Sequence, residues 1–408
     1  MPRTLQEGIY YQQGVRPGFF YAVVFLGLDE GAKAQQIRLE LQSLWMLYQG
    51  LKKGIAPEHP ANQVPAGNLT VLLGFGPNLF QLDGVARMPS ELLPKNRFLS
   101  PQSLGGGPLL TGSGLAYAAD ISRNTATEAV AIQFIADTQL AVYRSVMETW
   151  NCVVNSRPAD ASPGLRFNAF FDGFSRDDRR SWIGFHDGVS NMRSGLEREN
   201  AIRIKNGPNT NGTTFCFLRL EVDVPAWRKR SRAEQELLVG RDKFSGCPFC
   251  RQDSNGTPVV IDGCPAGGTG EVVGPGNEDY RMPPSVPATA MSVRQSHVQR
   301  ANNAHRTDTD VPQSLRIFRQ GYEFFEALSV PPGFRAGLNF VSFQDTPARV
   351  ISILTRQDWL GSTNFGGDPT HPLPGMDSLL KVRAGGIYLA PPADDSLPFP
   401  GADLFTAV

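Results

Sequence analysis

The sequence lacks a net charge, because its 39 lysines and arginines balance 39 aspartates and glutamates over 408 residues. This balance argues against nucleic acid or an anionic membrane surface as the main partner. The chain also has no run of about 20 apolar residues, the length that a membrane-spanning helix needs. Its first residues, Met1-Pro-Arg-Thr-Leu-Gln-Glu7, do not show the basic and then apolar stretches of a secretory signal. We therefore expect a cytoplasmic protein, unless a leader has been removed.

Cysteine is too scarce for a disulfide framework, with five in the whole chain. Cys247-Pro-Phe-Cys250, followed by Cys264, is the only grouping that suggests a metal or redox site. A structural zinc site needs four ligands, and no fourth candidate lies close in the sequence. We expect a local disulfide in an irregular loop, or free thiols. A metal or redox protein built on this pair is the least favoured hypothesis, and the sequence gives these three cysteines no definite role.

The length allows two or three domains with sizeable cores. In the first part of the chain, apolar patterns predict strands at residues 19–28, 68–74 and 129–136 and helices at 32–53 and 138–150. In the first helix, apolar residues recur at three- and four-residue spacing from Ile37 to Tyr48, and Gly54 suits the C-terminal cap. Residues 155–164 are predicted to be a linker because they are rich in proline, serine and small polar residues.

The second part of the chain repeats this order with an insertion. The predicted strands are 214–222, 316–324, 337–344 and 386–390, and the predicted helices are 231–239, a short one around His297, and 347–360. Ser231-Arg-Ala-Glu234 is a capping box, whereas residues 251–287 are expected to be irregular. The sequence thus predicts an α+β fold of two ferredoxin-like βαββαβ units with antiparallel sheets, divided as residues 1–155 and 156–408.

Two stretches carry residues suited to redox chemistry on a flat cofactor. Ser181-Trp-Ile-Gly-Phe-His-Asp-Gly-Val-Ser-Asn191, at the start of the second domain, contains Asp187 in a turn whose glycines let the backbone approach a ligand. The second stretch offers His297 and then a strand with Arg316 and Arg319, which alternation places on opposite faces. An imidazole, a carboxylate and an arginine are what a haem peroxidase site needs. They hold the iron, move the proton of peroxide and stabilise the charge that develops as its O–O bond breaks.

At these residues the sequence resembles the dye-decolorising peroxidase family. The matching segments occur in family order and span most of the chain, from about Leu69 to Pro392. They are Gly184-Phe-His-Asp-Gly188 with Asn191, Ser296-His-Val-Gln-Arg-Ala-Asn302, Arg316-Ile-Phe-Arg-Gln-Gly-Tyr322, Gly337-Leu-Asn-Phe-Val-Ser-Phe-Gln344 and Gly385-Gly-Ile-Tyr-Leu-Ala-Pro-Pro392. The resemblance implies the same duplicated fold, with haem b in the C-terminal half.

The resemblance also implies a role for each site residue. His297 is the expected axial ligand of the haem iron, Asp187 the proton acceptor and Arg319 the residue that stabilises charge. Phe340, with Leu338, is expected to wall the distal pocket. The family often has an arginine two residues after the axial histidine. Here that position is Gln299, and Arg300 follows it, so Arg300 is the candidate for a contact with a haem propionate.

Several of these residues have simpler explanations. His305 is the rival of His297, but it lies in a polar loop that is too wet for a haem ligand. Asp187 alone suits an ordinary turn. Asp377 is the candidate that accepts a hydrogen bond from the second ring nitrogen of His297, although it equally suits a helix cap. His186 and Asn339 are both expected to face outward.

The predicted function is therefore that of a haem-dependent peroxidase. It would reduce hydrogen peroxide and oxidise phenols, dyes or other bulky aromatic substrates one electron at a time. The low ordinary pKa of an aspartate, near 4, would favour activity at mildly acidic pH. The alternative is a haem-binding protein of the same fold that acts in haem transfer or iron release, and steady turnover of peroxide separates the two. The sequence leaves a homo-oligomer open and does not identify the physiological reductant.

Overall fold

The computed structural model of the chain describes residues 3–10, 18–59, 63–93, 118, 125–155, 162–178, 180–186, 195–260, 293, 296–298, 317–354 and 379–405. Of the predicted site residues, His297, Arg319 and Phe340 fall within these ranges. Asp187, Arg300 and Asp377 lie outside the described residues. Within the described ranges, no helix is long and apolar enough to cross a membrane.

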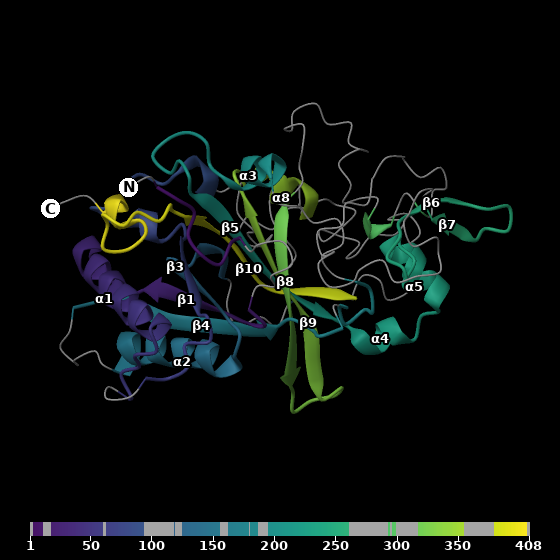
Figure 1. Cartoon of the computed structure of the whole chain (residues 1–408), viewed down its shortest axis with the longest axis horizontal. Coiled ribbons are helices and arrows are strands. Elements are labelled where there is room, and N and C mark those ends of the chain that lie inside the picture. The colour runs from purple at the N-terminus through teal and green to yellow at the C-terminus, as the bar shows by residue number, and fades with distance from the viewer. Residues whose placement is uncertain are drawn as a thin grey trace.

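The N-terminal unit is an antiparallel sheet with two helices on its outer face (Figure 1). Its strands pair in the order β4-β1-β3-β2. In chain order its elements are β1 (Phe20–Leu28), α1 (Ala34–Lys52), β2 (Thr70–Phe75), β3 (Val130–Ala136), α2 (Gln139–Trp150) and β4 (Leu165–Phe174). The sequence prediction found all of these elements except β4.

Strand β4 begins after the linker that we predicted, yet it pairs with β1 over most of its length. Strand pairing therefore places residues 165–174 in the first sheet, although they fall after residue 155. The pattern of β4 was hard to recognise because its register with β1 shifts between Phe25 and Leu26, where the partner changes from Ala169 to Phe167. Such a shift interrupts the two-residue alternation by which a strand is recognised. The domain division itself stays a prediction.

The C-terminal unit repeats the same arrangement, with its strands in the order β10-β5-β9-β8. Its elements are β5 (Thr213–Val222), α4 (Val224–Arg228), α5 (Arg232–Val239), β8 (Phe318–Ala327), β9 (Phe334–Gln344), α8 (Ala348–Leu354) and β10 (Leu380–Ala390). A helix, α3 (Leu196–Ile202), precedes β5, and a hairpin of β6 (Phe249–Gln252) and β7 (Pro258–Val260) follows α5. We predicted irregular structure from residue 251 onward, and this prediction was wrong for the hairpin, which extends to residue 260.

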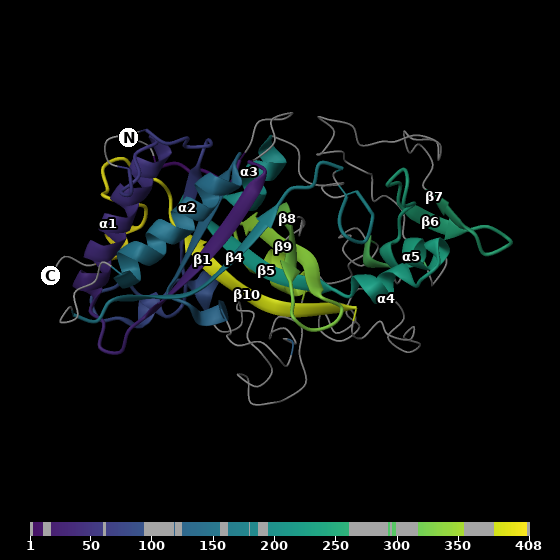
Figure 2. The same cartoon turned by 90° about the horizontal axis from the view of Figure 1, so that it is seen from below.

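The two sheets join at both edges and form one closed sheet. Leu389 of β10 pairs with Phe75 of β2, and Phe174 of β4 pairs with Glu323 of β8. Figure 2 shows the strands of both units crossing in the middle of the molecule, with α1 and α2 toward one end and α4 and α5 toward the other. The predicted fold of two ferredoxin-like units is thus confirmed, and the closure of their sheets is an addition to it.

The closed sheet separates two buried regions. Its interior is lined with aromatic rings, among them Tyr21, which stacks on Tyr322 with a centroid distance of 4.5 Å. Arg219 is buried in this interior, and its guanidinium lies 3.6 Å from the ring centroid of Phe324. The Arg219 guanidinium donates a hydrogen bond to Asn339 Oδ1 at 2.7 Å. Asn339 is therefore fully buried, and the expectation that it faces outward was wrong.

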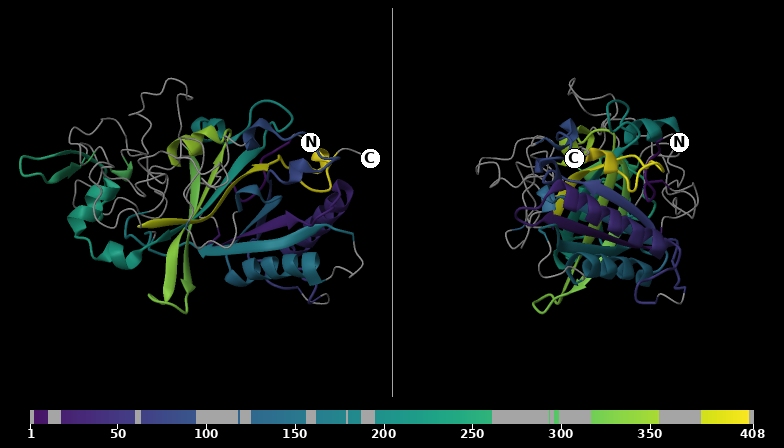
Figure 3. Two further views of the ribbon diagram at one scale, coloured as in Figure 1. Left: turned by 180° about the vertical axis from the view of Figure 1, so that it is seen from behind. Right: turned by 90° about the vertical axis from the view of Figure 1, so that its left-hand side faces the viewer.

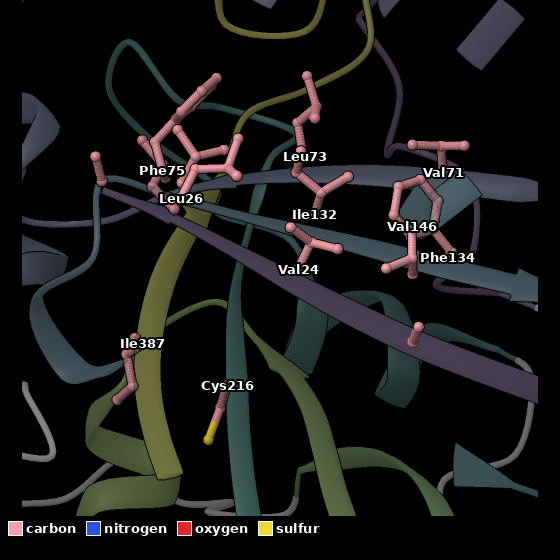
Figure 4. Packing of buried hydrophobic residues seen from close by; sticks show 14 of the residues in the cluster. Val24, Leu26, Val71, Leu73, Phe75, Ile132, Phe134, Val146, Cys216 and Ile387 are labelled. Carbon is pink, nitrogen blue, oxygen red and sulfur yellow. The ribbon is translucent and has the colours of Figure 1, made fainter. Parts of the chain in front are cut away.

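The outer faces of the two sheets carry the second buried region, against which the helices pack. Strand residues of the N-terminal unit gather there, and Figure 4 shows those of three neighbouring strands pointing to the same side. Cys216 and Ile387, from the C-terminal unit, lie on adjacent strands of the same figure and belong to the same region. The outer face of the C-terminal sheet carries Arg319 and Phe340.

Candidate functional site

The outer face of the C-terminal sheet places Arg319 and Phe340 next to each other. Arg319 of β8 pairs with Ser342 of β9, and Gly321 pairs with Phe340. Because side chains two residues apart in a strand point to the same face, Arg319 and Phe340 are diagonal neighbours. Both are half-buried. Phe340 packs on the outer region together with Leu218 of β5, to which it is paired, so this face is apolar beside the arginine.

The segment that carries His297 lies against the C-terminal end of α5. A capping box of Ser231 and Glu234 starts this helix, and Gly240, in the left-handed conformation at φ 84°, ends it. A Cβ atom at Gly240 would lie 2.7 Å from Ser296 Cβ, so a larger residue would push the histidine segment away. Val298, on the other side of His297, packs on the same outer region as Phe340.

The imidazole of His297 is kept neutral by its surroundings. Burial lowers its pKa to about 3, and the positive charges of Arg319 and then Arg241 contribute in the same direction. A neutral imidazole at physiological pH is the form that can bind a metal ion through a ring nitrogen. The influence of Arg319 on His297 also shows that the structure brings these two predicted residues together, although 21 positions separate them in the sequence.

Arg241 is a third residue of this group that the sequence did not reveal. It follows the capping residue Gly240, is buried, and donates a hydrogen bond from Nη1 to the carbonyl oxygen of Gly246 at 2.8 Å. Burial and the charge of Arg319 lower the pKa of Arg241 to about 9. Its position after a helix-capping glycine was visible in the sequence. The approach of that helix end to His297 was not, because it depends on tertiary packing.

The turn that leads to Asp187 is fixed by the guanidinium of Arg180. This group donates hydrogen bonds to the carbonyl oxygens of Gly184 at 2.9 Å and Lys243 at 2.8 Å, and lies 2.9 Å from His186 Nε2. His186 is 8 % exposed, so the expectation that it faces outward was wrong. It is buried because Arg180 gives its ring a polar partner inside the turn. The same guanidinium ties the turn to the segment just after Arg241.

Two tryptophans attach the same turn to the C-terminal unit. Trp227 of α4 donates from Nε1 to the carbonyl oxygen of Ile183 at 2.9 Å, and Trp182 donates from Nε1 to the carbonyl oxygen of Phe324 at 2.9 Å. Phe185 is buried and meets the Trp227 ring edge-on at 6.4 Å. The backbone up to His186 is therefore held against α4 and β8. Asp187 follows immediately in sequence, and its part in the site stays a prediction, as do those of Arg300 and Asp377.

The cysteines do not form a metal centre in the part of the chain that the structure describes. Cys247 is in a disulfide, whereas Cys250 is a free, half-buried thiol. The described residues contain no group of three or more histidine, cysteine, aspartate or glutamate side chains that could hold a metal ion. Cys247 and Cys250 are therefore not a dithiol pair, and a local disulfide was one of the outcomes expected for this loop.

Residues 178–395 match the family model described as Dyp-type peroxidase, C-terminal. Among curated proteins, a deferrochelatase from Shigella sonnei (strain Ss046) is 24 % identical over 345 residues, which cover 78 % of this chain and 69 % of that protein. A deferrochelatase from Escherichia coli (strain K12) is 23 % identical over 345 residues, with the same coverage.

Solved structures show the same architecture. A DyP-type peroxidase from Cellulomonas bogoriensis has a TM-score of 0.65 at 18 % sequence identity, over 98 % of this chain and 96 % of that one. Ferric DtpA from Streptomyces lividans has a TM-score of 0.66 at 18 % identity, over 98 % and 97 % of the two chains. At this identity the likeness establishes the fold, and the match of residues 178–395 establishes the family.

Proposed function

The chain belongs to the Dyp-type peroxidase family, and on that premise we propose that it reduces hydrogen peroxide at a haem b group on the outer face of the C-terminal sheet. Its reducing substrates are phenols, dyes or other bulky aromatic molecules. The observation that carries this proposal is the packing of the His297 segment against the end of α5, where Arg241 follows Gly240, near Arg319 of β8. Both arginines lower the pKa of His297 and so help to keep its imidazole neutral.

The described residues fit a haem group in charge and polarity. A porphyrin with two carboxylates is an anion, and Arg319 and Arg241 bring two positive charges to the place where one neutral imidazole stands. Phe340, Leu218 and Val298 belong to the apolar region beside these groups, which suits a flat, apolar ring. His297 would hold the iron, and Arg241 or Arg300 would pair with a propionate.

The chemistry divides between the cofactor and the side chains. When bound, haem would supply the redox centre that takes the two oxidising equivalents of hydrogen peroxide and passes them, one electron at a time, to the reducing substrate. Asp187 accepts a proton from hydrogen peroxide and returns it to the oxygen atom that departs as water. Arg319 stabilises the negative charge that develops on that oxygen as the O–O bond breaks. Phe340 limits the access of water, and Asp377 accepts a hydrogen bond that orients His297.

Arg180 has a supporting part in this scheme as a positioning residue. Its hydrogen bonds to Gly184 and Lys243 connect the turn before Asp187 with the segment after Arg241. A proton acceptor must lie within hydrogen-bond reach of the proton that it abstracts. Fixing the turn on one side and the α5 end on the other sets the distance between Asp187 and the arginines.

A second candidate function is haem transfer or the release of iron from haem. The deferrochelatases that are 23 % and 24 % identical to this chain favour it. It would use the same His297 and arginine group to bind haem, but it would not require steady consumption of peroxide. Both functions use haem, but a peroxidase would produce oxidised aromatic substrates, whereas iron release would produce iron-free porphyrin.

The test is turnover of the full chain reconstituted with haem b. An absorption spectrum before and after addition of hydrogen peroxide, followed by oxidation of a phenol, should show a haem band, a spectral change and continuing product formation. Haem binding without turnover, together with accumulation of iron-free porphyrin, would favour the second candidate. Failure to bind haem at all would contradict both.

A further inference from the structure

Helix α2 exposes an apolar stripe that no described part of the chain covers. A π-helical turn at Asn151–Asn155 continues the helix. Five large apolar or aromatic side chains of these two elements are exposed, with exposed fractions of 60 % for Leu140, 39 % for Tyr143, 57 % for Met147, 43 % for Trp150 and 46 % for Val154. Their three- and four-residue spacing puts them on one face. The only other exposed positions between 139 and 155 are Gln139 and Asn155, at the two ends.

The charged residues of α2 point away from this stripe. Arg144 is buried and donates from Nε to Glu58 Oε1 at 3.0 Å, and Glu148 is also buried. Surface helices normally place their charged residues on the solvent side and their apolar residues toward the core. In α2 the solvent side is mostly apolar from Leu140 to Trp150, so water is an unfavourable neighbour for it.

The neighbouring strand β4 extends the apolar surface. Phe170 is 45 % exposed and pairs with Val24, whose side chain points to the outer face. Asp172 lies two residues further on the same face, and its Oδ2 accepts a hydrogen bond from Tyr143 Oη at 2.5 Å. The helix stripe and Phe170 are thus contiguous. We call the stripe residues and Phe170 together the α2 surface; α2 lies along an edge of the molecule in Figure 1 and Figure 3.

The size of the α2 surface is that of a protein–protein contact. With full areas of about 200 Å² for side chains of this size, the exposed fractions leave on the order of 600 Å² of mostly apolar surface. The largest exposed apolar patch on a typical monomer is about 300–600 Å². Stable interfaces bury roughly 600–1,000 Å² on each partner. The six side chains alone reach the lower end of that range.

We propose that the α2 surface binds the α2 surface of a second copy of this chain, with the two helices antiparallel about a twofold axis. In such a contact the same set of residues lies on both sides, so a charge close to the twofold axis would meet its own copy; the stripe between Leu140 and Val154 exposes no charge. Residues three, four and seven positions apart form a ridge that can pack beside an identical ridge. An anionic membrane is a poor fit, because such surfaces are flanked by lysine and arginine.

Met147 lies at the middle of the stripe and therefore next to the twofold axis. Its flexible thioether can adapt to an identical neighbour. Leu140 lies seven residues from it, so the two copies of Leu140 would be separated by roughly 20 Å along an antiparallel pair, at 1.5 Å per residue. The contact leaves the outer face of the C-terminal sheet open, and the proposal does not depend on the proposed peroxidase function.

The first test measures the mass of the full chain in solution by light scattering or sedimentation over a range of concentrations. The wild type should form a dimer, and Met147→Glu, which places two like charges together, should raise the dimer dissociation constant about a hundredfold or more. Leu196→Glu is the matched control, because Leu196 is 82 % exposed in α3, outside the α2 surface, and should leave the dimer intact. A monomeric wild type, or a Met147→Glu variant that dimerises normally, would overturn the proposal.

The second test does not depend on weakening the contact. In a Cys152→Ser background, which removes the free thiol beside the stripe, Met147→Cys should form an intermolecular disulfide under mild oxidation. Leu140→Cys should not, because its two copies lie too far apart. Cross-linking of both variants to the same extent, or of neither, would contradict the antiparallel pairing. Unchanged peroxide turnover in Met147→Glu would show separately that the α2 surface lies outside the catalytic machinery.

Discussion

The two ferredoxin-like units share one strand order, but their outer faces are built from different residues. In the N-terminal sheet the outward positions of neighbouring strands carry Val24, Leu73 and Ile132, all fully or almost fully buried (Figure 4). In the C-terminal sheet the corresponding face carries Arg319 and Ser342. A face that is apolar throughout can be sealed by helices. A face that carries a guanidinium is not sealed by apolar packing alone, because burial of a charge requires a polar or charged partner.

The helices that cover the two outer faces also differ, because those on the N-terminal face are longer. The N-terminal face is covered by α1 with 19 residues and α2 with 12. The C-terminal face has α4 with 5 residues, α5 with 8 and α8 with 7. The short α5 ends at Gly240, next to the His297 segment. One copy of the fold thus provides a filled core, and the other provides a face where helix ends and turns meet.

The strongest test of this difference is His297→Ala, which should abolish stable haem binding or leave the iron without its axial donor. The haem absorption band would be lost or shifted and peroxide turnover would be lost, while circular dichroism would show an intact fold because the apolar N-terminal core is unchanged. His305→Ala is the control and should behave as wild type. If His305→Ala loses haem and His297→Ala does not, the axial assignment is wrong.

The N-terminal face is tested by Phe134→Ala. Phe134 is fully buried and meets the Tyr48 ring edge-on at 5.2 Å, so its removal should cost about 3–5 kcal/mol in the free energy of unfolding. Phe340→Ala, at a half-buried position beside Arg319, should cost only about 1–2 kcal/mol. Urea unfolding of the protein without cofactor measures both. Equal losses would mean that the two faces are equally well filled.

Arg319→Leu should bind haem and fold normally, yet lose about 3 kcal/mol of stabilisation in the reaction with peroxide, roughly a hundredfold in rate. Rapid mixing with peroxide measures the rate, and the resting spectrum reports haem content. Arg316→Leu is the matched control, since the alternation of the sequence predicts that its side chain faces away from that of Arg319. If Arg316→Leu reacts slowly with peroxide and Arg319→Leu reacts at the wild-type rate, our assignment of the two side chains to the faces of the strand is wrong by one residue.

Arg180→Leu tests the fixation of the turn. Without its hydrogen bonds to Gly184 and Lys243, the turn before Asp187 should become less well placed and slow the peroxide reaction about tenfold. Arg180→Lys should restore part of the rate by supplying one donor, and haem content should stay near wild type in both. An unchanged rate in Arg180→Leu would show that Trp182 and Trp227 alone fix the turn.

The smallest expected effect is at Asp178, where the chain passes from β4 to the turn. Hydrogen bonding to Arg176 is the largest cause that lowers the pKa of Asp178 from 3.8 to about 2. Because the pKa is lower in the folded state, the contribution to stability is present above pH 4 and is lost as pH falls toward 2. The pair is partly exposed, so the contribution should be below about 1 kcal/mol. Unfolding of wild type and Asp178→Asn should differ at pH 7 and converge near pH 2; a constant difference would exclude this carboxylate as the cause.

Local patterns in the sequence determined most of the elements of this protein. Spacing predicted α1, α2 and α5, and the capping box and Gly240 bounded α5 as observed. Apolar runs predicted seven of the eight strands of the closed sheet. These signals are readable because a buried helix face or strand face repeats every few residues. The ordered motifs around His297 and Arg319 likewise identified the family, and the site residues that they suggest stay predictions.

Only the tertiary structure decided which distant residues meet. The sheet closes through the pairs Leu389–Phe75 and Phe174–Glu323, each between segments more than a hundred residues apart. The charge of Arg241 acts on His297 only because the end of α5 lies against the segment that carries the histidine. Such contacts leave no periodic trace in the sequence, because they follow from how finished elements stack and not from which face of one element is buried.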